Sequence, residues 1–416
     1  MYIRPSLQHM QLRNRILVIG IIVTFFTCKT KTEQTKSFPS SEVVSKQMDS
    51  IMGESDLPGL VAIAINKDGE RIEYTFGNAI WNEGTPIKTN NIYRIASMTK
   101  LVTSLAALQL VEKDSLGLDE DLSSLMPEMT SIPILTDKKE LIDGENLITL
   151  RQLLTHTSGF GYFFTDSLLA THDASNWNYE DLPRRFEANT QFLYGTSTNW
   201  VGKLVEKISG LSLEEYFRKN ITGPLNMNRT WFNVPDSLHN KIITCGRRGD
   251  DGSESLTEIP DAYPKSKTQN YDGGGGLFSS PEDYIKLLAC LLNEGTYPDG
   301  QLLQKKTINQ IFKEQLEGVS MDIKENYYQQ DLCCNFEGLI KPTSNWGLAG
   351  LIDTEMTSYG RKEGTLLWGG VYNTYWYIDR KSGIAASIFT QYLPFNHSAT
   401  TSVFDKFSEM IYKNYN

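Results

Sequence analysis

Residues 97–111 read SMTKLVTSLAALQLV, with Ser97 and Lys100 three positions apart at the start of a run that is almost entirely apolar. Residues three apart share one face of a helix. The N-terminal end of a helix favours negative charge because its backbone N–H groups are unpaired. A helix with so little polar surface is normally buried. The stretch therefore predicts a buried helix that begins with a serine and a lysine on one face.

Burial has a chemical consequence for Lys100. A lysine withdrawn from water loses its proton more readily, and a partly neutral amine beside a hydroxyl makes that hydroxyl nucleophilic. We therefore interpret Ser97 as a candidate nucleophile that Lys100 activates. Ser-x-x-Lys is a common pattern, so on this pattern alone a charged, solvated lysine near a helix start is the alternative.

The composition limits the classes of partner. The chain has 416 residues, of which 40% are hydrophobic, so it has material for a large core in one large domain or two to three small ones. A net charge of −10 argues against binding to nucleic acid. The five histidines are scattered without metal-ligand spacing, so we expect neither a metal nor another cofactor. Cys290 lies in an apolar run and is expected in the core.

The first residues have the pattern of an export signal. Arg4, Arg13 and Arg15 precede the apolar run 16–26, which is too short to span a bilayer comfortably. The run ends before Cys28 in a sequence that resembles a bacterial lipoprotein cleavage site. We therefore expect a signal peptide at 1–28, lipidation of Cys28, and a polar tether at 29–41. Simple cleavage and retention as an anchor are the alternatives. The mature protein would be exported to the periplasm or outer surface and held on a membrane by its lipid.

The remaining chain, 42–416, is expected to form one domain of the α+β class, an α/β sandwich. Elements suited to a sheet occur at both ends of the chain, and the part between them is mainly helical. This order predicts a central antiparallel sheet built from both chain ends and flanked by helices. An all-helical lobe is inserted at roughly 97–263, with the cleft between the lobes. The expected terminal elements are helices at 41–52 and 404–412 and strands at 59–65, 71–76, 365–368, 372–378 and 384–391.

Four consecutive glycines, Gly273 to Gly276, allow two interpretations. A phosphate cradle is one, but the run lacks the Lys-Ser/Thr of a P-loop and the spacing of a dinucleotide fingerprint. A loop that permits close packing is the interpretation we favour.

Several motifs together carry a family resemblance. They are YRIASMTK at 93–100, LLTHTSG at 153–159, the glycine run into Leu277-Phe278-Ser279, and Trp368-Gly369-Gly370. In this order the chain resembles the serine β-lactamase and penicillin-binding-protein superfamily over roughly 41–416. It is most similar to the class C-like esterases called family VIII carboxylesterases. The resemblance implies a β-lactamase/transpeptidase-like fold and catalysis through an acyl-enzyme on Ser97.

The same resemblance implies a tyrosine next to Ser97 and Lys100. Tyr194 is the best candidate, with Tyr162 and Tyr179 as rivals. A phenolate near a lysine could accept the serine proton. Penicillin-recognising members have Asn where this chain has Thr196, and the esterase branch commonly has Asp at the position of Asn199.

The Lys-Thr-Gly strand motif of those members is replaced here by Trp368-Gly369-Gly370. The literal Lys381-Ser382-Gly383 is expected at a hairpin tip, away from the cleft. Because the family's Lys and Thr bind a carboxylate, their loss favours uncharged acyl groups. By the resemblance, the backbone N–H groups of Ser97 and Val371 form the oxyanion hole. Aromatic residues that could wall an acyl pocket, or equally pack in the core, are Phe160, Tyr162, Phe163, Phe164, Tyr372, Tyr375 and Trp376.

These observations predict an exported serine hydrolase, a carboxylesterase acting on a small-molecule ester with an uncharged acyl group. Two alternatives stay open. One is a DD-peptidase or β-lactamase that acts on peptide-like cell-wall substrates or β-lactams. The other is a non-catalytic binding protein on the same scaffold.

Overall fold

The computed structural model describes residues 36–415 except 82, 176, 250–254, 261–265, 322–331, 334, 335, 337, 342 and 414. The chain divides into two units, Met1–Lys36 and Ser37–Asn416, and the fold below is that of the second. The expected signal peptide, Cys28 and most of the tether lie outside the described residues, so export and lipidation stay predictions. No helix within the described ranges combines the length and hydropathy needed to cross a membrane.

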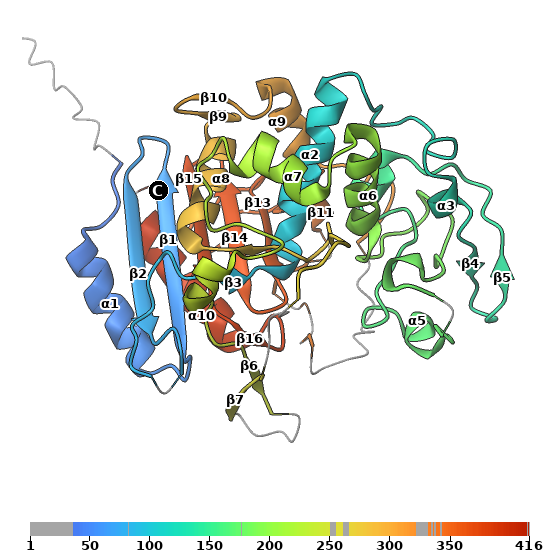
Figure 1. Cartoon of the computed structure of the whole chain (residues 1–416). Coiled ribbons are helices and arrows are strands. Elements are labelled where there is room, and N and C mark those ends of the chain that lie inside the picture. Colours follow the sequence, from blue (N-terminus) through green and yellow to red (C-terminus); the bar gives the residue numbers. More distant parts are fainter. Residues whose placement is uncertain are drawn as a thin grey trace, which may run out of the picture. The chain divides into compact units, whose positions relative to one another are not determined.

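One antiparallel sheet of seven strands organises the unit, and it draws strands from both ends of the sequence as predicted (Figure 1). Its order is β11-β12-β13-β14-β15-β1-β2. The N-terminal pair therefore lies beside the C-terminal β15, through a register that includes Ile63 opposite Ser387. The strands are β1 (Gly59–Asn66), β2 (Arg71–Gly77), β11 (Asn345–Trp346), β12 (Leu351–Ile352), β13 (Leu366–Gly370), β14 (Thr374–Asp379) and β15 (Ile384–Phe389).

Helices cover both faces of this sheet. On one face lie α1 (Ser41–Gly53) and α10 (Ser398–Tyr412), and Tyr377 of β14 packs 5.5 Å from Phe404 of α10. On the other lies α8 (Pro281–Leu292), where Tyr284 packs 6.1 Å from Phe389 of β15. Since neighbouring strand residues face opposite sides, every residue of β13, β14 and β15 is buried. Cys290 is in the core on α8, as expected.

The helix predicted from residues 97–111 is present and buried. A short 3₁₀ turn, η1 (Ala96–Met98), leads directly into α2 (Thr99–Glu112), and residues 99–110 are all buried. Around α2 pack α6 (Ser197–Ser209) and α7 (Leu213–Phe217), and α4 (Leu150–Leu154) packs on α6. A Thr149 capping box starts α4. Other helical segments are α3 (Pro127–Thr130), α5 (Ser167–Thr171), α9 (Lys305–Ile311), η2 (Tyr179–Asp181), η3 (Arg218–Thr222) and η4 (Asp236–Lys241).

The inserted region is not purely helical, which corrects one expectation. It contains the hairpin β4 (Ile134–Leu135) with β5 (Leu141–Ile142), and β6 (Gly246–Arg248) with β7 (Leu256–Glu258). These strands have two or three residues, too few to show a period of two in the sequence. Moreover, β6 pairs with β16 (Tyr392–Leu393), almost 150 positions away along the chain, so tertiary contact creates it. Further short strands are β3 (Tyr93–Arg94), β8 (Phe278–Ser279), β9 (Thr296–Tyr297) and β10 (Gly300–Gln301).

Two boundaries also differ from prediction. The last helix begins at Ser398 rather than Phe404, because the His397 side chain caps a polar first turn that lacks apolar periodicity. The strand expected from Tyr372 begins at Thr374, because Asn373 turns the backbone with a φ of 57°.

The end of β13 meets the start of the Ser97 helix. A Cβ added at Gly370 would clash with the Ile95 carbonyl oxygen and would lie 2.6 Å from Thr374 Oγ1. Glycine is therefore required for the strand to approach η1 this closely. This approach positions the next residue, Val371, near Ser97.

We predict that Gly370→Ala lowers the free energy of unfolding by about 1–3 kcal/mol, because a methyl group there must displace backbone. Gly53→Ala is the matched control, since no atom lies within 4 Å of the added Cβ. Urea denaturation followed by circular dichroism measures both. Equal stability of the two variants would contradict the close approach.

Candidate active site

Ser97 lies where the group of helices around α2 meets the end of strand β13. It is half-buried in η1, and the preceding Ala96 has a φ of 42°, which is strained for a residue other than glycine. Backbone strain of this kind concentrates at functional positions. The serine is thus held at a helix start with its hydroxyl facing Lys100.

Lys100 is buried, with 3% of its surface exposed, and its amine has three neighbours. Its Nζ lies 3.3 Å from Ser97 Oγ, 2.8 Å from the Tyr162 hydroxyl and 2.7 Å from the Gly274 carbonyl oxygen. The carbonyl can only accept a hydrogen bond. If Tyr162 accepts a second, a neutral amine has its lone pair left for the Ser97 proton. The geometry therefore suits Lys100 as the base.

The charge state follows from the burial. Removal from water lowers the pKa of Lys100 to about 7, against the opposing effect of the Asp272 carboxylate. An amine with this pKa is neutral in a large fraction of molecules at neutral pH. The sequence-based interpretation of a desolvated lysine is thus supported by the structure.

Tyr194 is brought to the same point, from the loop before α6. Its hydroxyl accepts a hydrogen bond from Trp368 Nε1 at 3.0 Å and is hydrogen-bonded to Ser97. Burial raises the pKa of Tyr194, and these two contacts only partly oppose that effect. Burial therefore disfavours a Tyr194 phenolate and favours a neutral phenol, which leaves Lys100 as the better candidate for the base.

The positions of the two strand motifs favour Trp368-Gly369-Gly370 over Lys381-Ser382-Gly383 as the one at the candidate site. Trp368 lies on β13 and contacts Tyr194, whereas Lys381 lies in the β14–β15 turn, paired with Glu363 at 2.6 Å. The indole N–H thus supports the tyrosine from the strand position where penicillin-recognising relatives have a carboxylate-binding lysine.

The glycine run packs against α2 and α6 and binds Lys100 through its backbone. Thr103 Oγ1 donates to the Gly273 carbonyl at 2.7 Å, and the backbone N–H of Leu277 donates to Thr99 Oγ1 at 3.1 Å. A Cβ at Gly273 would lie 3.0 Å from Gly202 Cα. The close-packing interpretation is confirmed.

Three residues at the site were not assigned these roles from the sequence. Tyr162 contacts Lys100 directly, although it had been considered as a rival to Tyr194 or as part of an acyl pocket. His156 packs 4.7 Å from the Tyr194 ring, and burial keeps its pKa well below the usual value. Asp272 faces Lys100 from the loop before β8. Each contact joins segments that are distant in the sequence, so no local pattern signals it; the buried LLTHTSG motif around His156 is the one hint.

The aromatic residues proposed for an acyl pocket lie in different places. Tyr162, Phe163 and Phe164 cluster beside Lys100, together with Tyr179. Phe160 and Trp376 are in the core instead. Tyr375 lies on the α10 face of the sheet, where it packs against Phe404. Tyr372, next to Val371, packs 5.0 Å from the Arg94 guanidinium.

A cavity of about 670 Å³ opens beside Tyr194. Phe192, Phe336 and Ile340 form part of its apolar wall, and Arg185 and Gln191 are among its polar residues. Small-molecule sites usually have volumes of 300–1,000 Å³ and this mixed character. Its lining includes Tyr194 but not Ser97 or Lys100, so it is a candidate space for the part of a substrate that extends beyond Tyr194.

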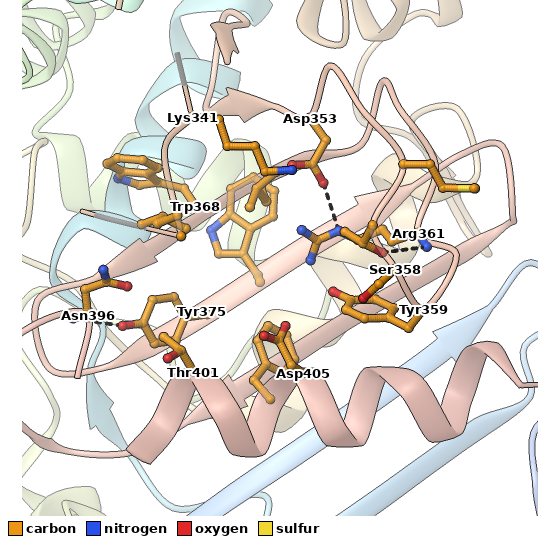
Figure 2. A pocket seen from close by; sticks show the side chains of 17 residues that line it. Lys341, Asp353, Ser358, Tyr359, Arg361, Trp368, Tyr375, Asn396, Thr401 and Asp405 are labelled. Atoms are coloured by element: carbon orange, nitrogen blue, oxygen red, sulfur yellow. Dashed lines mark hydrogen bonds and ion pairs between the residues drawn. The ribbon is translucent and has the colours of Figure 1, made fainter. Parts of the chain in front are cut away.

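A second cavity, of about 340 Å³, lies on the α10 face and is drawn in Figure 2. Its charged groups pair with acidic partners nearby: Arg361 Nε lies 2.8 Å from Asp353, and Lys341 lies 3.8 Å from Glu355. The first pair lies within the β12–β13 loop, and the second joins that loop to the segment before β11, so both basic groups have acidic partners.

Comparisons with known proteins agree with the geometry. A sequence model of the family described as Beta-lactamase matches residues 44–403. Monacolin J acid methylbutanoyltransferase of Aspergillus terreus is 31% identical over 86% of this chain and 92% of its own. Lovastatin esterase of Penicillium rubens is 29% identical over 80% and 88%.

Solved structures give the same result. A LovD6 mutant of simvastatin synthase from Aspergillus terreus aligns with a TM-score of 0.80 and 30% identity over 89% of this chain and 95% of its own. EstCE1, described as a hydrolase with promiscuous acyltransferase activity, shares the fold at a TM-score of 0.68 and 21% identity. That alignment covers 90% of this chain and 98% of EstCE1.

We predict that a fluorophosphonate probe labels Ser97 faster as the pH rises. The labelling rate should reach half of its maximum at about pH 7. Below the midpoint Lys100 is protonated and cannot accept the serine proton, so the rate falls tenfold per pH unit. Labelling of the purified protein at pH 5–9, quantified by mass spectrometry, measures this. A rate that does not change over the range would contradict the assignment of Lys100 as the base.

Proposed function

Because the chain belongs to the β-lactamase family of serine hydrolases, we propose that it cleaves carboxylic esters through an acyl-enzyme on Ser97. The observation that supports this most directly is the buried Lys100 amine, 3.3 Å from the serine oxygen and with a pKa of about 7. A neutral amine at this distance is the base that a serine nucleophile needs.

In the first half-reaction the Ser97 proton passes to Lys100 Nζ while the serine oxygen bonds to the ester carbonyl carbon. The bond from that carbon to the alkoxy oxygen then breaks. The departing oxygen takes this proton from Lys100 and leaves as an alcohol, while the Tyr194 hydroxyl, hydrogen-bonded to Ser97, orients the serine oxygen. In the second half-reaction, water gives a proton to Lys100, attacks the acyl carbon and releases Ser97 with its proton restored.

The oxyanion formed in both halves needs hydrogen-bond donors. We assign this role to the backbone N–H groups of Ser97 and Val371. The support is positional, since Gly370 lies against Ile95 and so brings the residue after β13 to the residue at the helix start. Removal of one such donor typically lowers kcat about 10²–10³-fold.

The substrate class follows from two features of the cleft. Trp368 has replaced the family's carboxylate-binding lysine, and its N–H is already used by Tyr194. The cavity next to Tyr194 is large and partly apolar. Both favour an ester of an uncharged acyl group over a β-lactam or a cell-wall peptide.

Transfer of the acyl group to a second alcohol is a further candidate function. The comparisons favour it, since the methylbutanoyltransferase and the lovastatin esterase are both similar to this chain over most of its length. The chemistry differs only in whether water or an alcohol attacks the acyl-enzyme. Both candidates use the same Ser97, Lys100 and Tyr194.

We predict that the purified protein hydrolyses p-nitrophenyl butyrate and that Ser97→Ala lowers kcat/KM by about 10³-fold or more. Added short-chain alcohols test for transfer, measured as new butyrate esters by mass spectrometry. Cys290→Ala, a change in the core on α8, is a control for handling and folding. Unchanged turnover in Ser97→Ala would refute the proposal.

Two labelling experiments, read beside the ester assay, separate the remaining alternatives. Stable labelling of Ser97 by a fluorescent penicillin, without ester turnover, would favour cell-wall or β-lactam chemistry. Failure of the fluorophosphonate probe to label Ser97 would favour a binding protein.

A further inference from the structure

Asp272 is a carboxylate in the loop that presents Gly274 to Lys100, and neither the family motifs nor the mechanism above assigns it a role. Its Oδ1 accepts two hydrogen bonds of 2.7 Å, from Asn199 Nδ2 on α6 and from the backbone N–H of Gly274. Its own carbonyl accepts from the N–H of Gly276 at 2.8 Å. The side chain therefore fixes both the conformation of the loop and its attachment to α6.

The loop in turn holds the amine. The Gly274 peptide donates its N–H to the Asp272 carboxylate, and the carbonyl of Gly274 accepts from Lys100 Nζ at 2.7 Å. A Cβ at Gly274 would clash with Asn199 Oδ1, so Gly274, Asn199 and Asp272 are closely packed. A change at Asp272 is thus transmitted to Lys100 through one residue.

The carboxylate also acts through its charge. Asp272 is the acidic group whose attraction stabilises protonated Lys100. Burial raises the pKa of Asp272, and the charge of Lys100 and the hydrogen bond from Gly274 oppose that rise. The other titratable groups around Lys100 are the phenols of Tyr162 and Tyr194, while buried His156 is repelled by the lysine charge. Behind Asp272 lie Tyr179 and Glu180, and the charge of Glu180 is paired with Lys203 at 2.9 Å.

We propose that Asp272 is a positioning residue of the active site: its carboxylate holds the Gly274 carbonyl against Lys100 and sets the proton affinity of that amine. The inference rests on the proposed function, in which Lys100 is the base for Ser97. Asn199 hydrogen-bonds to Asp272, so the contact between α6 and the glycine loop contains one carboxylate.

Asp272→Asn separates charge from geometry. Both hydrogen bonds are accepted by Oδ1, which the asparagine carbonyl retains, so the loop should keep its shape while the negative charge is lost. Without that charge Lys100 releases its proton at lower pH. We expect the acid limb of kcat/KM for p-nitrophenyl butyrate to move down by about one pH unit, with the plateau changed less than about threefold. The fluorophosphonate labelling rate at Ser97 should move by the same amount.

Two variants control for unrelated effects. Asp272→Glu keeps the charge, so its acid limb should stay within about 0.3 pH units of the parent, whatever happens to its plateau. Asp283→Asn removes another buried carboxylate, one that binds Thr230 and Lys286 and does not act on Lys100, so its limb should not move. If Asp272→Asn does not fold, Asp272→Ser removes the charge with a side chain that can still accept the Gly274 N–H.

The outcomes are distinct. An acid limb that moves down in Asp272→Asn and stays in the two controls supports the role of Asp272. An unmoved limb in folded Asp272→Asn, or an equal shift in Asp283→Asn, overturns it. A parent protein with neither ester turnover nor labelling at Ser97 would refute the proposed function itself, and with it this inference.

Discussion

The structure depends on the burial of one amine. Lys100 sits in the first turn of a helix whose residues 99–110 are all buried, and only 3% of its own surface is exposed to water. Burying an ammonium group is costly unless it is paired or neutralised. The site does both in part, with three hydrogen-bonding neighbours and one carboxylate nearby. The balance leaves the amine close to half-protonated near neutral pH.

The rest of the fold brings distant segments to that amine. The sheet places the end of β13 against the residue before the Ser97 turn. Tyr194 comes from the loop before α6. Trp368, on the sheet, donates a hydrogen bond to its hydroxyl, and His156, just after α4, packs against its ring. The glycine loop closes the remaining side against α2 and α6. The sheet and the group of helices around α2, which come from different parts of the sequence, thus meet at Ser97.

Much of this arrangement could be predicted from the sequence. Burial of α2 follows from its composition, and the ordered motifs predicted that Ser97, Lys100, Tyr194 and β13 would meet. The roles of Tyr162 and Asp272 could not be predicted, because each depends on a contact between a loop and the distant helix α2, and neither residue type is distinctive in its local sequence. The neutral state of Tyr194 is also beyond sequence reasoning, since it depends on how deeply the phenol is buried and on which donors reach it. Likewise, β6 pairs with the distant β16 as well as with its neighbour β7, and the local sequence does not signal the distant pairing.

The central claim is that Lys100 loses its proton with a midpoint near pH 7, and a nuclear magnetic resonance titration of its side chain tests this most directly. The protein would carry ¹³C-labelled lysine, with the Lys100 signal assigned by its loss in Lys100→Arg. The account predicts that the Cε chemical shift of Lys100 titrates with a midpoint of about 7. A signal that stays at the protonated position up to pH 9 would contradict it.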